Sequence, residues 1–93
     1  MFALEWCEFC WAVRKLFARC DVAYRSVDLD SAAYQVEDLG GRLRGALRER
    51  TGSRTIPQIF VAGRFIGGAT EVFDALEGGE LQRELAAAGV AFD

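Results

Sequence analysis

The spacing of apolar residues predicts an amphipathic helix near the start of the chain. Between Glu8 and Cys20 the apolar side chains recur every three or four residues, at Cys10, Val13, Leu16, Phe17 and Cys20. Apolar residues at this spacing share one face of a helix, so they would pack against a core. Residues 2–5 predict a short strand before the helix. The stretch VAYRSVDL, residues 22–29, is rich in β-branched and aromatic residues and predicts a second strand after it.

The middle of the chain predicts a second helix with a weak point. The helix is expected to run from about Ala33 to Arg50. The pair Gly40-Gly41 should weaken or break it, since glycine disfavours a helix interior. Thr51-Gly52-Ser53 should end it, with Gly52 suited to a left-handed C-terminal cap.

The last third of the chain predicts a hairpin and two further helices. Segments 58–61 and 64–66 flank Ala62-Gly63, a two-residue hairpin signal. Thr70 is expected to cap the next helix, and the last helix covers about residues 80–88. The order of elements predicts one α/β domain over residues 1–93, with a parallel strand pair, a crossover helix and an antiparallel hairpin.

Composition and charge narrow the class of protein. The 93 residues are 52% hydrophobic and 27% charged, as in an ordinary globular domain. The net charge of −3 argues against nucleic acid or an anionic membrane as the main partner. No apolar run is long enough to span a bilayer, and no secretory leader is recognisable. Five arginines between residues 42 and 54 form either a solvated helix face or a small anion site.

The chain has no histidine and three cysteines, which removes several kinds of chemistry. A Ser-His or Cys-His dyad, a histidine metal ligand and a four-cysteine zinc site are all excluded. Three cysteines are also too few for a secreted disulfide scaffold. We therefore expect a reducing compartment, the cytoplasm, and thiols with a chemical role.

Cys7 and Cys10 form a Cys-x-x-Cys motif where a predicted strand gives way to a helix. The helix N-terminus stabilises a thiolate at Cys7, and Cys10 lies on the same face, so Cys7 is the predicted nucleophile and Cys10 the resolving thiol. The carboxylate of Glu8 opposes this effect and should make the thiolate less favourable than a proline there would. Cys20 lies ten residues beyond Cys10, about 15 Å along a straight helix and outside disulfide reach. We expect it to pack at the helix end.

Three motifs in order, CEFC at 7–10, TIP at 55–57 and IGGATE at 66–71, resemble the glutaredoxin family over nearly the whole chain. The resemblance implies a thioredoxin-like fold with a four-stranded mixed sheet flanked by helices. It also implies glutathione-dependent reduction of disulfides, above all protein–glutathione mixed disulfides.

The resemblance further implies a set of glutathione-binding residues. They are Phe9, Arg44, Thr55, Ile56, Pro57, Gly68, Ala69, Thr70 and Glu71. In the family the proline is cis, and the residue before it pairs with the cysteinyl part of glutathione. The helix start after the glycines receives the γ-glutamyl carboxylate, and the acidic residue, here Glu71, meets the ammonium group. Arg44 falls where a basic or amide residue meets the glycine carboxylate.

The chain departs from the family pattern at several positions. Leu4 stands where many members have a lysine for the glycine carboxylate, and Phe9 replaces a common tyrosine. The segment from Tyr34 to Gly41 is a few residues longer than usual and offers a docking loop or tolerated surface. The first strand is short. Either the strand is minimal, or the chain is a module of a larger bacterial protein or was cut from one.

Three other functions stay open at this stage. Some glutaredoxins without the active-site proline hold a [2Fe–2S] cluster between two subunits, through the first cysteine of each, here Cys7, and two glutathiones. The domain could also regulate a fused or docked enzyme through its disulfide state, or be reduced by thioredoxin reductase. We expect a monomer whose partners are glutathione and glutathionylated or disulfide-containing proteins.

Overall fold

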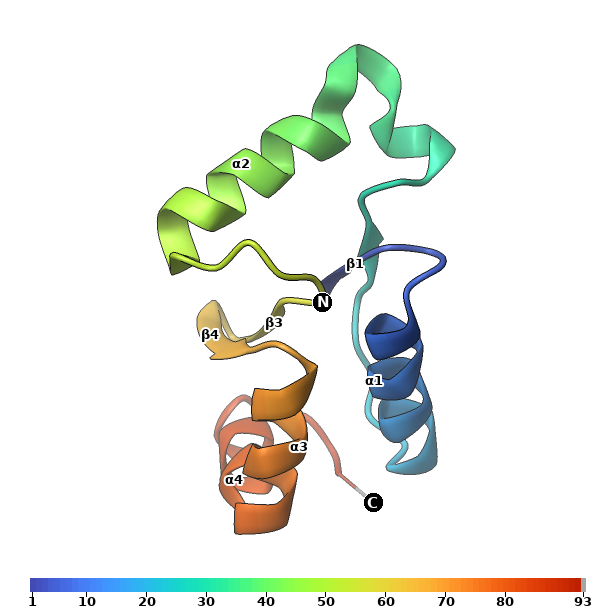
Figure 1. The fold of residues 1–93 in the computed structure, drawn as a ribbon. Helices are drawn as coiled ribbons and strands as arrows, with labels where there is room; N and C mark the ends of the chain where they lie inside the picture. Colours follow the sequence, from blue (N-terminus) through green and yellow to red (C-terminus); the bar gives the residue numbers. More distant parts are fainter. Residues whose placement is uncertain (93) are drawn as a thin grey trace.

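The computed structural model describes residues 1–92, and its elements follow the predicted order (Figure 1). The strands are β1 (Phe2–Ala3), β2 (Val27–Asp28), β3 (Ile59–Val61) and β4 (Arg64–Gly67). The helices are α1 (Glu8–Arg19), α2 (Leu39–Thr51), α3 (Ala69–Gly78) and α4 (Glu80–Ala87). Two 3₁₀ turns, η1 (Ala32–Tyr34) and η2 (Val36–Asp38), lead into α2.

The strands form two pairs that meet at one bridge. β1 and β2 are parallel, and β3 and β4 form the antiparallel hairpin. Phe2 and Gln58 exchange two backbone hydrogen bonds, of 2.8 and 2.9 Å, which join the pairs in the order β2-β1-β3-β4. The mixed parallel and antiparallel arrangement is therefore as predicted, but the strands meet through this narrow bridge and not through a continuous four-stranded ladder.

The strand predicted at 22–29 is wrong in length. Only Val27–Asp28 pair with a neighbour, because β1 itself offers two residues before the chain turns toward α1. The backbone N–H of Glu5 is bound instead by the Asp30 carboxylate at 2.8 Å. Val22 is buried in the core without belonging to a strand. Its hydrophobicity thus reflects packing and not strand pairing.

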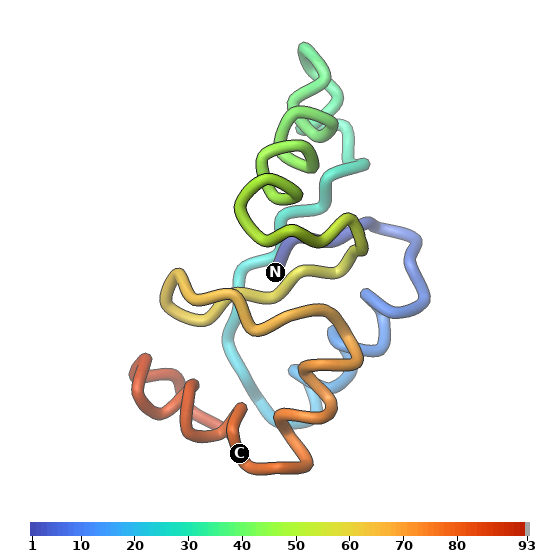
Figure 2. Tube along the Cα trace, turned by 60° about the vertical axis from the view of Figure 1, so that its left-hand side comes forward, coloured from blue at the N-terminus to red at the C-terminus, as the bar shows by residue number. Residues whose placement is uncertain are grey.

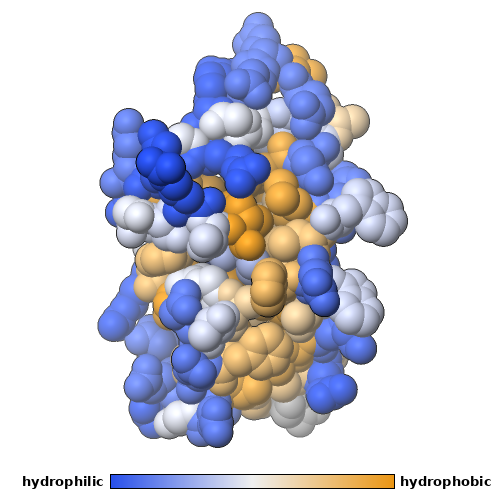
Figure 3. All heavy atoms as spheres, viewed as in Figure 1, coloured by the Kyte–Doolittle hydropathy of each residue, from blue (hydrophilic) through white to orange (hydrophobic). Residues whose placement is uncertain are grey.

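The main core lies between the strands and the three helices α1, α3 and α4, while α2 lies across the strands from them (Figures 1 and 2). Val13 of α1, Val72 of α3 and Leu81 of α4 are almost completely buried there. Figure 3 shows hydrophilic residues over the α2 end of the molecule and apolar residues over its middle. On its own side, α2 buries Leu47.

The predicted break at Gly40-Gly41 is misplaced. Glu37 and Asp38 carry the irregular backbone, with φ values of 52° and 54°, and both glycines lie in the first turn of α2. A side chain at Gly40 would overlap the carbonyl oxygen of Leu29. This glycine therefore allows the helix to approach the segment after β2, and it does not interrupt the helix.

Two predicted turns are confirmed and one predicted cap is wrong. Gly52 is left-handed after α2, with φ of 75°, and Ala62-Gly63 makes the hairpin turn with φ of 50° and 82°. α3 begins two residues earlier than expected, at Ala69, so Gly68 and not Thr70 is its N-cap. The Glu71 carboxylate accepts a 2.8 Å hydrogen bond from the Gly68 N–H, which a glutamate at the third helical position can reach.

Within residues 1–92 no helix combines the length and the apolar character needed to cross a bilayer.

Gly40→Ala is expected to lower the free energy of unfolding by about 1–3 kcal/mol, because the added methyl group would displace α2 from Leu29. Gly45→Ala, on the same helix, is the matched control. Its methyl group would meet open space, so the free energy should stay unchanged or rise by up to about 1 kcal/mol. Urea unfolding followed by circular dichroism measures both. Equal stabilities for the two variants would contradict the close approach of α2.

Candidate active site

The two thiols of the Cys-x-x-Cys motif occupy different environments. Cys7 is the N-cap residue of α1, and its carbonyl accepts from the Trp11 N–H at 2.9 Å. Cys10 lies in the first turn with no exposed surface, while Cys7 is partly exposed. Both thiols are free. The predicted helix position is confirmed, and Cys7 is the thiol that a substrate can reach.

The surroundings favour the thiolate of Cys7. Burial raises its pKa, but the N–H and thiol of Cys10, the N–H of Phe9 and the charge of Arg14 together lower the pKa below that of an ordinary thiol. The neutral thiol lies 3.9 Å from the Ile56 carbonyl oxygen. The comparison with a proline in place of Glu8 stays a prediction.

The pKa of Cys10 moves in the opposite direction, to about 11. Burial is the main cause, and the hydrogen bond to Cys7 and the charge of the Cys7 thiolate raise it further. The N-terminus of α1 therefore holds one ionisable and one neutral thiol side by side.

Arg14 is fixed by contacts that the sequence did not predict. Its guanidinium donates to the Asp28 carboxylate at 2.8 Å and to the Leu4 carbonyl at 2.9 Å. The hydroxyl of Ser26 donates to the same Asp28 oxygen. These bonds tie the guanidinium to β2 and to the residue that follows β1. Arg14 lies seven residues after Cys7 on α1, and this spacing places both on one helix face.

A groove beside the thiols brings together eight of the nine predicted glutathione-binding residues. They are Phe9, Thr55, Ile56, Pro57, Gly68, Ala69, Thr70 and Glu71, around a volume of about 280 Å³. The Ile56-Pro57 peptide bond is cis, as the resemblance implied. A side chain at Gly68 would lie 3.3 Å from the Pro57 carbonyl oxygen, so the two loops pack closely. The first turn of α3 opens into this groove.

Arg44 does not line the groove. It lines a neighbouring hollow of about 320 Å³ with Gly41, Gly45, Arg48 and Arg54. Arg54 directly precedes Thr55, so the two hollows adjoin along the chain. Within residues 1–92 none of these three arginines has a carboxylate within 4.0 Å. The role predicted for Arg44 stays a prediction.

Gln58 is a residue that sequence reasoning missed. It is almost completely buried, and its amide donates to the carbonyl oxygens of Ser53 and Thr55 at 3.0 and 3.2 Å. The Thr51 hydroxyl lies 3.2 Å from its side-chain oxygen. Gln58 therefore fixes the shape of the loop that forms one wall of the groove. A polar residue between a proline and an apolar strand was the available signal.

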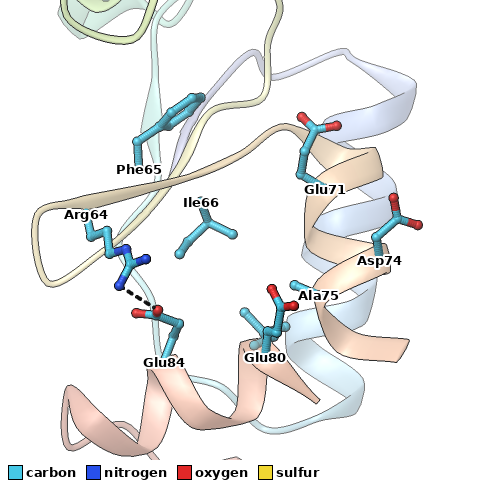
Figure 4. A pocket seen from close by; sticks show the side chains of 9 residues that line it. Arg64, Phe65, Ile66, Glu71, Asp74, Ala75, Glu80 and Glu84 are labelled. Carbon is cyan, nitrogen blue, oxygen red and sulfur yellow. Dashed lines mark ion pairs between the residues drawn. The ribbon is translucent and has the colours of Figure 1, made fainter. Parts of the chain in front are cut away.

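A second, acidic cavity lies away from the thiols, between β4, α3 and α4 (Figure 4). Its volume is about 370 Å³, and Glu71, Asp74, Glu80 and Glu84 supply its carboxylates. An ion pair of 2.9 Å between Arg64 and Glu84 crosses one side of it. The described residues contain no group of three or more cysteine, aspartate or glutamate side chains that could hold a metal ion.

Comparisons with known proteins agree with the geometry. The glutaredoxin family model matches residues 1–66. The chain is 37% identical over 89 residues to the chloroplastic Glutaredoxin-C4 of Oryza sativa subsp. japonica, covering 96% of this chain and 63% of that protein. It is 38% identical to the mitochondrial Glutaredoxin-2 of Mus musculus, covering 87% of this chain and 49% of that protein. The chain thus spans roughly half to two thirds of the length of these relatives.

Solved structures show the same fold. A buckwheat glutaredoxin–glutathione complex superimposes with a TM-score of 0.87 at 31% identity, covering 97% of this chain and 77% of that chain. The holo form of glutaredoxin C1 from Populus tremula x tremuloides gives a TM-score of 0.83 at 30% identity, covering 95% and 75%.

The fold and the dithiol at the start of α1 define a thioredoxin-like protein with a Cys-x-x-Cys motif. The chain belongs to the glutaredoxin family.

The alkylation rate of Cys7 by iodoacetamide is expected to rise with pH through a midpoint below that of an ordinary thiol, because its pKa is lowered. Cys10, with a pKa of about 11, should stay unmodified until strongly alkaline pH. Cys10→Ala should move the Cys7 midpoint upward, because the thiol hydrogen bond is lost. Mass spectrometry of the modified peptides measures each rate. A synthetic peptide of residues 4–12 with serine at position 10 is the unfolded reference, and a midpoint equal to the peptide's would contradict the stabilised thiolate.

Proposed function

We propose that the protein is a glutathione-dependent thiol–disulfide oxidoreductase that reduces protein–glutathione mixed disulfides and small disulfides through Cys7. The observation that carries this proposal is the position of Cys7. Its accessible, low-pKa thiol lies 3.9 Å from Ile56, whose loop and the first turn of α3 form the walls of one groove. A similar solved structure is a glutaredoxin–glutathione complex, which supports glutathione as the ligand of this groove.

The reaction requires two exchange steps. The Cys7 thiolate attacks the glutathione sulfur of the mixed disulfide, forming a Cys7–glutathione disulfide as the target's thiolate leaves and takes up a proton. The thiolate of a second glutathione then attacks the glutathione sulfur bound to Cys7. Oxidised glutathione leaves, and the Cys7 thiolate is restored. One reduced glutathione is consumed in sum: the target's mixed disulfide and this glutathione give the target thiol and oxidised glutathione.

Cys10 enters when the substrate is a protein disulfide. Its thiol must lose a proton before it can attack Cys7 in the mixed disulfide, and its pKa is about 11 while Cys7 is reduced. Formation of the mixed disulfide removes the negative charge of Cys7, which is one of the causes of this raised pKa. The first step therefore prepares the second thiol, and two glutathiones later reduce the Cys7–Cys10 disulfide.

The groove offers a partner to each part of glutathione. The backbone of Ile56 is available to the cysteinyl unit, as an added strand would pair with it. The N–H groups at the start of α3, at Ala69 and Thr70, suit the γ-glutamyl carboxylate. Glu71 uses one carboxylate oxygen for the Gly68 N–H, and its negative charge suits the ammonium group. The hollow lined by Arg44, Arg48 and Arg54, which we call the arginine hollow, suits the glycine carboxylate. Its Arg54 directly precedes Thr55 of the groove.

A [2Fe–2S] cluster held by Cys7 is the alternative to this function. Cys10 is fully buried, so one copy offers Cys7 as the accessible thiolate of the motif, and the other cluster ligands would come from a second copy and from glutathione. A second alternative is that the domain regulates a fused enzyme through its disulfide state. We also propose that the protein is cytoplasmic and monomeric.

Cys7→Ser is expected to lose turnover of a glutathionylated peptide by at least about a thousandfold, because the nucleophile is removed. Cys10→Ser should retain activity within about tenfold, since reduction of a glutathione mixed disulfide needs one thiol of the protein. The assay couples oxidised glutathione to glutathione reductase and follows NADPH.

Retention of turnover in Cys7→Ser would contradict Cys7 as the nucleophile. A parent protein that is inactive with glutathione would contradict the proposed function. In that case, a brown colour after anaerobic purification would favour the cluster, and reduction by thioredoxin reductase would favour a glutathione-independent route.

Arg44→Gln is expected to raise the KM for glutathione about three- to tenfold with kcat nearly unchanged, because a charge pair at a partly solvated site is lost. Arg42→Gln is the matched control. It removes the same charge from the same helix, but its guanidinium faces Glu37 at 4.0 Å and does not line the hollow. Steady-state kinetics at varied glutathione measures both, and equal KM values for the two variants would exclude a local role for Arg44.

A further inference from the structure

A second hollow reaches Cys7 and shares no residue with the groove. Glu5, Trp6, Cys7, Glu8 and Trp11 line it, around a volume of about 350 Å³. The Cys7 thiol also lies near Ile56, in the wall of the groove. Cys7 therefore stands at the boundary between the groove and this hollow, which we call the tryptophan hollow.

The two tryptophans of the hollow contribute little to the core. Trp6 is 91% exposed, although it directly precedes the nucleophile, and Trp11 is 59% exposed. Leaving large aromatic surfaces in water is unfavourable. Tryptophan is also the residue that most often supplies binding energy at protein interfaces. Their position beside Cys7 thus indicates contact with a partner, and their exposure shows that packing of the fold does not require them.

The charges of the tryptophan hollow favour a cationic partner. Within residues 1–92 neither Glu5 nor Glu8 has a cation within 4.0 Å. The nearby Arg14 is already engaged by Asp28 and Leu4. The ammonium group of Lys15 lies 4.4 Å from the centre of the Trp11 ring and already occupies that cation site, so Trp6 is the tryptophan available to a partner's cation. Aromatic faces beside unpaired carboxylates are the chemistry that recognises lysine and arginine side chains.

The reaction brings the target polypeptide to this place. Its disulfide sulfur must come within bonding distance of Cys7, while its glutathione half occupies the groove. The polypeptide half must then cover the part of the Cys7 surroundings that glutathione leaves open. The tryptophan hollow, which includes Cys7 itself, lies there.

Resting on the proposed function, we propose that the tryptophan hollow selects the target polypeptide. It binds a lysine or arginine that flanks the glutathionylated cysteine. The aliphatic and cationic parts of that side chain pack on Trp6, and its charge pairs with Glu5 or Glu8.

The test compares three glutathionylated heptapeptides that differ only in the residues flanking the cysteine: arginine, glutamine or glutamate. The mixed disulfide of glutathione and 2-mercaptoethanol, which has no flanking residue, is the fourth substrate. The parent protein should show a kcat/KM for the arginine peptide about five- to tenfold above that for the glutamate peptide. Salt should reduce this ratio, because it screens the charge pairs.

Trp6→Ala and Glu5→Gln should each bring the ratio of the arginine to the glutamate peptide toward one, with the small disulfide turned over as by the parent. Phe73→Ala and Glu49→Gln are the matched controls. Phe73→Ala removes an exposed aromatic ring and Glu49→Gln removes one carboxylate. Both residues lie outside the groove and the tryptophan hollow, so both variants should keep the parent's ratio. Circular dichroism verifies that all four variants fold.

A parent protein that reduces the small disulfide but treats the three peptides alike would overturn this inference and leave the proposed function standing. The inference is also overturned when Trp6→Ala and Glu5→Gln keep the same ratio as their controls. A parent that turns over none of the four substrates overturns the proposed function, and this inference with it.

Discussion

The candidate active site depends on two hydrogen bonds between Phe2 and Gln58. Phe2 belongs to the strand that leads into the thiols, and Gln58 directly follows the cis-proline loop. Among the described residues, 1–92, these two bonds of 2.8 and 2.9 Å connect the backbone of the β1-β2 pair to that of the hairpin. The side chain of Gln58 then reaches back to Ser53 and Thr55 and fixes the loop. Gln58 thus both joins the hairpin to β1 through its backbone and fixes the shape of the groove wall through its side chain.

The start of α1 gives the thiols of Cys7 and Cys10, which have the same chemistry, two different environments. Both are partly or fully removed from water, and burial alone would raise the pKa of each. Cys7 escapes this effect because it caps the helix, where N–H groups and Arg14 favour its thiolate. Cys10, one turn deeper, is left with burial and with the repulsion of its neighbour. The opposite pKa shifts of the two thiols therefore follow from one helical turn, and Asp28 and Leu4 hold Arg14 in place.

The parts of the structure that depend on nearby residues could be predicted from the sequence. The dithiol at a helix start, the Ala62-Gly63 turn and the left-handed Gly52 all follow from local chemistry. The groove residues followed from the three motifs, whose order matched a known family.

The parts that depend on distant residues could not be predicted. The length of β2 is decided by how many residues β1 offers, and Gly40 is explained only by its contact with Leu29. The prediction that Thr70 caps α3 was wrong because the side chain of Glu71 binds the Gly68 N–H, and the helix therefore starts directly after Gly68. The five arginines between residues 42 and 54 left two interpretations open, a solvated face or an anion site. Only the folded chain places three of them, Arg44, Arg48 and Arg54, around one hollow.

The charges around the thiols are separated in a way that suits a reaction between two unlike partners. Arg54 of the arginine hollow directly precedes Thr55 of the groove in which we propose that glutathione binds. The carboxylates of Glu5 and Glu8 surround the other approach to Cys7. A net charge of −3 could not produce such a preference by itself, because a uniform field acts alike on both approaches. For the function proposed above, the local placement of arginines in one hollow and carboxylates in the other therefore matters more than the net charge.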